Sequence, residues 1–86
     1  MKVLQIDPTP NPDAMKITVD FDKEDSRSST YDRVEDDNPG FINDLLNLEG
    51  VRSVFHALNF ITVDKKPDAD WDGLLDEVEN VINNQA

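Results

Sequence analysis

Carboxylates are the commonest reactive side chains in this chain, which has nineteen Asp and Glu residues, one histidine and no cysteine. Without cysteine, these residues can supply no disulfide, no thiol nucleophile and no thiolate ligand for zinc or an iron–sulfur cluster. His56 is the only imidazole. Because it lies beside a predicted hairpin turn, we expect a half-exposed structural residue, and no nucleophile-elbow motif accompanies it to indicate catalysis.

Carboxylate clusters are the remaining candidates for chemistry. Four acids spaced like the start of a calcium-binding loop are Asp20, Asp22, Glu24 and Asp25. The glycine of the sharp turn and the closing glutamate of such a loop are missing. The adjacent acids at 35–37 would point apart, and the three glycines form no phosphate-binding loop. A catalytic pocket is also hard to enclose in so small a domain. We therefore expect no catalytic residue, no metal ligand and no cofactor.

The charge balance excludes several classes of partner. The 86 residues carry a net charge of −11, and residues 67–86 contain six acids and no base. Such a surface repels nucleic acid and anionic membranes. The apolar runs are too short to span a bilayer, and the N-terminal residues do not resemble a signal peptide. We expect a single cytoplasmic domain over residues 1–86.

Alternating apolar and polar residues predict the strands. Val3 to Ile6 form a first short strand, which we expect Pro8 to stop because proline has no N–H for the sheet ladder. The clearest alternation runs from Met15 to Phe21. Residues 23–29 predict a polar turn, residues 30–34 a short strand, and residues 51–64 a hairpin that turns near 57–59.

Apolar residues at helical spacing predict two helices. The first has Asn38 as its N-cap, Pro39 at its first position and Gly50 as its C-cap. The second runs from Asp70 to Asn83. Two helices cannot cover both faces of the sheet, so we predict an α+β fold, a two-layer α/β sandwich with a mainly antiparallel sheet and both helices packed on one face. The expected core is Met15, Ile17, Val19, Phe41, Leu45, Val54 or Phe55, Ile61, Val63, Trp71, Leu75, Val78 and Ile82.

Three sequence motifs carry a family resemblance. Residues 9–16, Thr-Pro-Asn-Pro-Asp-Ala-Met-Lys, are similar to T-P-N-P-N-A-L/M-K, and residues 49–55 are similar to E-G-V-x-x-V-F. Residues 60–65, followed by Asp70-Trp71, are similar to F-I-T-V-x-K and D-W. In this order and spacing the chain resembles the N-terminal domain of Nfu/NifU-like iron–sulfur scaffold proteins over nearly its whole length.

The resemblance implies a non-catalytic accessory or protein-interaction module that is linked to iron–sulfur cluster assembly or delivery. In full-length members a separate domain carries the C-x-x-C pair that binds the cluster, and no ligand residue transfers to this chain. The implied partner is an iron–sulfur scaffold or client protein. The polar motif positions are Thr9, Asn11, Asp13 and Lys16, and we expect them to bind this partner. The prolines between them stiffen the loop, which lowers the entropy lost on binding.

A second hypothesis rests on charge alone. The acidic segment 67–86 would serve as the face of an acidic regulatory protein that binds a basic protein. Such binding weakens steeply as salt rises, whereas binding through a packed loop does not.

Overall fold

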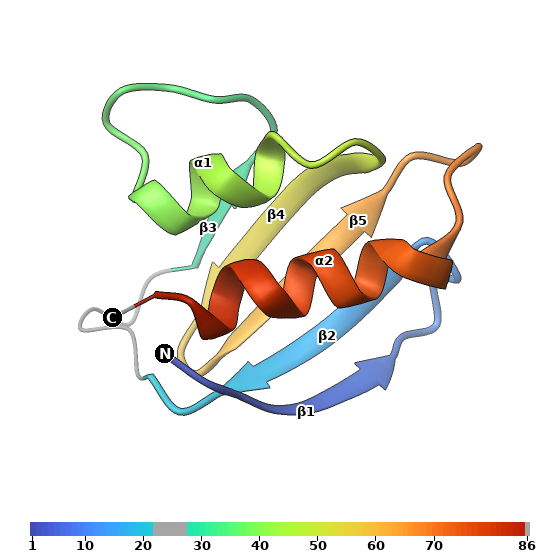
Figure 1. Ribbon diagram of the computed structural model, residues 1–86, viewed down its shortest axis with the longest axis horizontal. Helices are drawn as coiled ribbons and strands as arrows, with labels where there is room; N and C mark the ends of the chain where they lie inside the picture. The colour runs from blue at the N-terminus through green and yellow to red at the C-terminus, as the bar shows by residue number, and fades with distance from the viewer. Residues whose placement is uncertain (22–27, 86) are drawn as a thin grey trace.

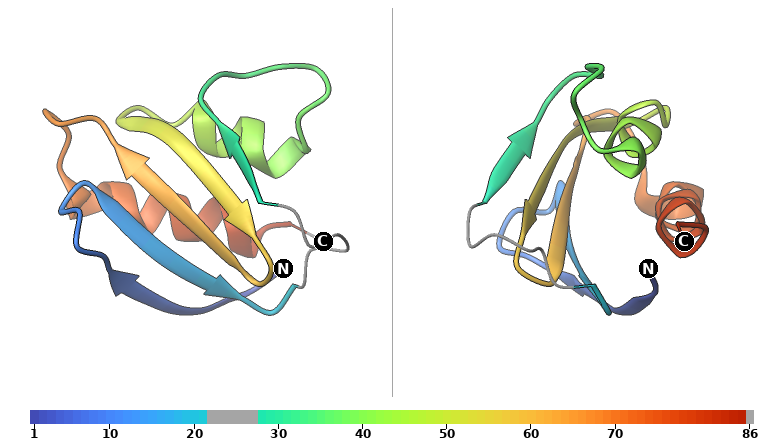
Figure 2. Two further views of the ribbon diagram at one scale, coloured as in Figure 1. Left: turned by 180° about the vertical axis from the view of Figure 1, so that it is seen from behind. Right: turned by 90° about the vertical axis from the view of Figure 1, so that its left-hand side faces the viewer.

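Five strands and two helices make up the fold. They are β1 (Val3–Pro8), β2 (Ala14–Val19), β3 (Ser29–Tyr31), α1 (Gly40–Leu46), β4 (Val51–Ala57), β5 (Phe60–Lys65) and α2 (Trp71–Asn83). The computed structural model describes residues 1–21 and 28–85. The strand order is β1-β2-β5-β4-β3, and all neighbouring strands are antiparallel (Figure 1). Both helices lie on one face of the sheet (Figure 2), which confirms the predicted two-layer α+β fold.

The strands match the predicted pattern with three differences. β1 continues through Pro8, which pairs with Met15 in register. Proline is tolerated there because β1 is an edge strand, where half of the N–H groups face away from the sheet. β2 ends at Val19, so Phe21 lies beyond the strand and is 41% exposed. The short strand expected at 30–34 is β3, which begins one residue earlier and ends three residues earlier. Most of the turn predicted at 23–29 lies outside the described residues.

The end signals predicted for the first helix are wrong, whereas the predicted range of the second helix is confirmed. Pro39 is the N-cap of α1, and the side chain of Asn38 instead donates to Arg33 O and Asn43 Oδ1. Asn47 is the C-cap, while Gly50 precedes β4 with a φ of +100°. At the second helix, Asp70 caps α2 by accepting from the backbone N–H of Asp72 at 3.0 Å.

The core lies between the sheet and the helices. Its buried residues are Ile17, Val19, Ile42, Leu45, Val51, Val54, Ile61, Val63, Leu74, Val78 and Ile82. Four residues expected in it are only half-buried, namely Met15, Phe41, Trp71 and Leu75. On α2 the buried side chains recur every four residues from Leu74, so Trp71 and Leu75 lie on the flank of that stripe.

Candidate functional site

Three connecting segments meet at one end of the sheet, and together we call them the loop end. They are the β1–β2 loop (9–13), the α1–β4 turn (47–50) and the β5–α2 connection with the start of the helix (66–73) (Figure 1). The backbone N–H of Lys65 donates to Asp13 O at 2.8 Å, and that of Lys66 donates to Gly50 O at 2.7 Å. The fold therefore brings the three sequence motifs into contact, although they are far apart in the chain.

The β1–β2 loop is shaped by its own side chains. The hydroxyl oxygen of Thr9 accepts from the backbone N–H of Asn11 at 3.1 Å and lies within donating distance of Asn11 O. The side-chain oxygen of Asn11 accepts from the backbone N–H of Asp13 at 2.9 Å. These bonds are typical of residues that form tight polar turns. Thr9 and Asn11, predicted as partner contacts, thus hold the loop's shape, and partner binding by them stays a prediction.

Asp13 makes the strongest electrostatic contact of the loop end. Lys65 Nζ donates to Asp13 Oδ1 at 2.8 Å, and the exposed fractions of the two side chains are 10% for Lys65 and 36% for Asp13. An ammonium group that is nearly buried needs such a carboxylate, because burial without one costs several kcal/mol, roughly. Asp13 therefore anchors the loop to the end of β5.

The single tryptophan ties the loop to α2. Trp71 Nε1 donates to Pro12 O at 3.1 Å, and the ring packs at the margin of the core. Buried or half-buried tryptophan commonly finds a partner for its N–H in this way. Trp71 therefore joins the first motif to the third.

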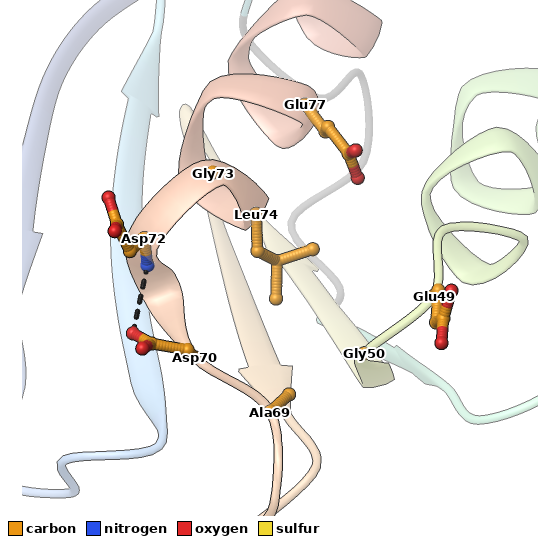
Figure 3. Close-up of a pocket in the computed structure, with 8 residues that line it drawn as sticks. All are labelled: Glu49, Gly50, Ala69, Asp70, Asp72, Gly73, Leu74 and Glu77. Carbon is orange, nitrogen blue, oxygen red and sulfur yellow. Dashed lines mark hydrogen bonds between the residues drawn. The ribbon is translucent and has the colours of Figure 1, made fainter.

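A pocket of about 350 Å³ opens beside these contacts (Figure 3). Its lining consists of Glu49, Gly50, Ala69, Asp70, Asp72, Gly73, Leu74 and Glu77. The ion pairs between described residues are Arg33–Glu35 and Lys65–Asp13. The four carboxylates of the pocket therefore form no ion pair with a described residue. Chemically the pocket suits a cationic side chain, and it offers neither a nucleophile nor an imidazole.

Sequence reasoning missed this pocket. The predicted helix runs from Asp70 without an interruption. In the structure the pocket lies between the turn at Gly50 and the start of α2, where Asp72 and Gly73 leave helical geometry. A D-x-D-G pattern at a helix start was the available signal for that interruption.

Lys16 is separated from the other three predicted contact residues. It lies in β2 on the sheet face opposite the helices, in register with Asp7 and Thr62. Its Nζ is 4.8 Å from the ring centroid of Phe60, within the range of a cation–π contact.

His56 is buried, at 3% exposure, so its prediction as half-exposed is wrong. It lies two residues after the buried Val54 and so faces the helices, where its ring meets Phe41 edge-on at 5.5 Å.

Of the acids that resembled a calcium loop, Asp20 accepts from the backbone N–H of Lys2, and the others lie outside the described residues. Within residues 1–21 and 28–85, no group of three His, Asp or Glu side chains converges as a metal site would require. The helices of the described part are too short or too polar to cross a membrane.

Comparison with known proteins places these features in a family. The sequence profile described as "Scaffold protein Nfu/NifU N terminal" matches residues 4–86. "Conserved virulence factor C" of Staphylococcus aureus MRSA252 is 42% identical over 86 residues, which are 100% of this chain and 23% of that protein. The same-named protein of Staphylococcus haemolyticus is 40% identical with the same coverage. The chain thus spans about a quarter of these curated relatives.

Solved structures agree with the fold. The crystal structure of protein SAV1430 from Staphylococcus aureus superimposes with a TM-score of 0.93 at 48% identity, covering 96% of this chain and 100% of that one. The solution structure of SeR13 from Staphylococcus epidermidis gives a TM-score of 0.70 at 38% identity, covering 95% of both chains.

Proposed function

Because the chain belongs to the family of Nfu/NifU scaffold N-terminal domains, we propose that it is a non-catalytic interaction module that assists iron–sulfur cluster assembly or delivery. Its partner in this proposal is an iron–sulfur scaffold or a client protein, met in the cytoplasm. The contact region includes the loop end and the four motif residues Thr9, Asn11, Asp13 and Lys16.

The observation that carries the proposal is the preorganised loop end. Hydrogen bonds and an ion pair fix the first motif to Lys65 of β5 and to Trp71, and a further hydrogen bond joins Lys66 to Gly50, before any partner arrives. A recognition surface that is already ordered loses little entropy on binding. The 86 residues contain no cysteine, so they have no thiolate to offer a cluster, and protein contact is the role left to them.

The test is a direct binding measurement between this chain and a purified iron–sulfur scaffold protein of the source organism. An affinity pull-down with mass spectrometry, at low and at physiological salt, selects the scaffold or client to purify. We expect binding at both salt concentrations, and weaker binding after Asn11→Ala and Lys16→Ala substitutions that preserve the fold. Lack of binding by any scaffold or client would refute the proposal.

The acidic pocket favours a second candidate, a regulator that binds a basic protein. Glu49, Asp70, Asp72 and Glu77 gather around a concave site, as a guanidinium or ammonium group would require. This candidate predicts recovery of basic proteins only, lost between low and physiological salt. Substituting Glu49 and Asp72 with their amides would weaken that binding.

A further inference from the structure

One whole face of the sheet carries no helix. Both α1 and α2 cover the opposite face, as the two views of Figure 2 show, and no other described segment lies over the open one. A sheet face that meets water is ordinarily lined with polar residues. The centre of this face departs from that rule.

Two phenylalanines and a lysine form a continuous group there. Phe55 of β4 and Phe60 of β5 have ring centroids 6.0 Å apart, and Lys16 of β2 holds its Nζ 4.8 Å from the Phe60 ring. Thr62 lies between them, since it pairs in register with both Lys16 and Phe55. We call Lys16, Phe55, Phe60 and Thr62 the open-face patch.

The patch differs in charge from the surface of α2. α2 carries four acids and no base on the other side of the protein. Lys16 is a cation without an ion pair to any described residue, although Asp7 lies opposite it in register. At physiological salt the Debye length is about 8 Å, so an approaching surface responds to the local charge of this patch more than to the net charge of −11.

This combination fits one kind of partner surface. An aliphatic or aromatic side chain can pack on the two rings, and a carboxylate can reach the ammonium of Lys16. A partner with such a surface is repelled from the acidic helix side and accepted on the sheet side. Aromatic side chains are enriched at protein interfaces, where a few residues carry most of the binding energy.

We infer that the open-face patch is where the protein partner docks, through an apolar side chain next to a carboxylate. The inference rests on the proposed function and refines it, because it moves the main contact from the β1–β2 loop to the sheet. Lys16 is the one predicted contact residue that lies in the open-face patch. Thr9, Asn11 and Asp13 then act by holding the loop's shape.

The test is an NMR titration of the ¹⁵N-labelled chain with the purified iron–sulfur scaffold protein, combined with affinity measurements on variants. We expect the largest amide shifts in β2, β4 and β5 around the patch. Lys16→Glu and Phe60→Ala should each weaken binding by about tenfold or more, and Lys16→Arg should stay within about twofold of the parent. Phe21→Ala is the matched control, since Phe21 is an exposed phenylalanine outside the patch.

The outcomes separate this inference from the proposed function. Binding with shifts confined to the loop end or the acidic pocket overturns the docking surface and leaves the interaction module standing. Binding that is unchanged by Lys16→Glu overturns it as well, and this variant lies on an exposed position where the fold is not at stake. No shift anywhere overturns both proposals.

Discussion

The ion pair between Asp13 and Lys65 predicts an asymmetric response to mutation. Asp13→Ala leaves the Lys65 ammonium, on a side chain only 10% exposed, without a carboxylate. Losing a hydrogen bond to a charged group costs about 1.5–3 kcal/mol, and breaking a fully buried pair costs about 3–5 kcal/mol. Because the Asp13 side chain is 36% exposed, we expect the lower range, a loss of about 2 kcal/mol in the free energy of unfolding.

The reverse substitution should cost much less. Lys65→Met keeps an apolar stem of similar length and leaves Asp13 free to be hydrated, so we expect a loss of about 0.5 kcal/mol. The double variant should resemble Lys65→Met, because the orphaned charge is then absent. The two single losses would therefore not add, which is the sign of a coupled pair.

Urea unfolding followed by the fluorescence of Trp71 and by circular dichroism measures these differences. Trp71 is the only tryptophan, and its N–H contacts Pro12 next to Asp13. A loss of 2 kcal/mol lowers the midpoint of thermal unfolding by roughly 8–16 °C in a domain of this size. Equal losses for Asp13→Ala and Lys65→Met, or a larger loss for Lys65→Met, would refute the reasoning.

Three further predictions concern the backbone and the tryptophan. Leu58 has a φ of +47° at the β4–β5 turn and is 56% exposed, so Leu58→Gly should raise the unfolding free energy by about 0.5–1 kcal/mol in urea titrations; a decrease would contradict the strain. Gly50→Ala should lower the unfolding free energy by about 2–3 kcal/mol, since its new Cβ would lie 3.2 Å from a neighbouring side chain. Gly73→Ala meets open space and should lower the unfolding free energy by about 1–2 kcal/mol. Thermal unfolding of the two variants should show this order. Trp71→Phe should lower the unfolding free energy by about 0.5–1 kcal/mol through loss of its bond to Pro12 O, and an unchanged midpoint would show that water replaces that bond.

Local sequence patterns predicted an element correctly where its contacts are also local in the chain. The alternation through Ile17 and Val19 placed β2 and its buried side correctly. The helix start predicted at Asp70 is also correct, and Asp70 caps α2 by accepting from the backbone N–H of Asp72. The predicted layers then followed from the number of helices and the one wet face of the sheet.

Local patterns gave wrong or incomplete predictions where a side chain bonds to a competing partner or to one far away in the chain. Asn38 was a sound cap candidate, but its side chain donates to Arg33 O in the preceding loop and to Asn43 Oδ1 in α1 instead. His56 was placed by its nearness to a turn, although its spacing from Val54 already indicated the buried face. The partner of Asp13 lies 52 residues along the chain, which no local pattern reveals.

The strand order also constrains how the chain folds as it is made. β1 and β2 form a local hairpin, but β2 finds its second neighbour only in β5, where Ala14 meets Asp64. An isolated two-stranded hairpin is only marginally stable in water. During translation, at about 5–20 residues per second, the N-terminal hairpin therefore waits for several seconds with one edge unpaired. Closure of the sheet is then a long-range and comparatively slow step. The ties from the β1–β2 loop to Lys65 and Trp71 form only after it, so residues made later in translation fix the position of a loop made earlier.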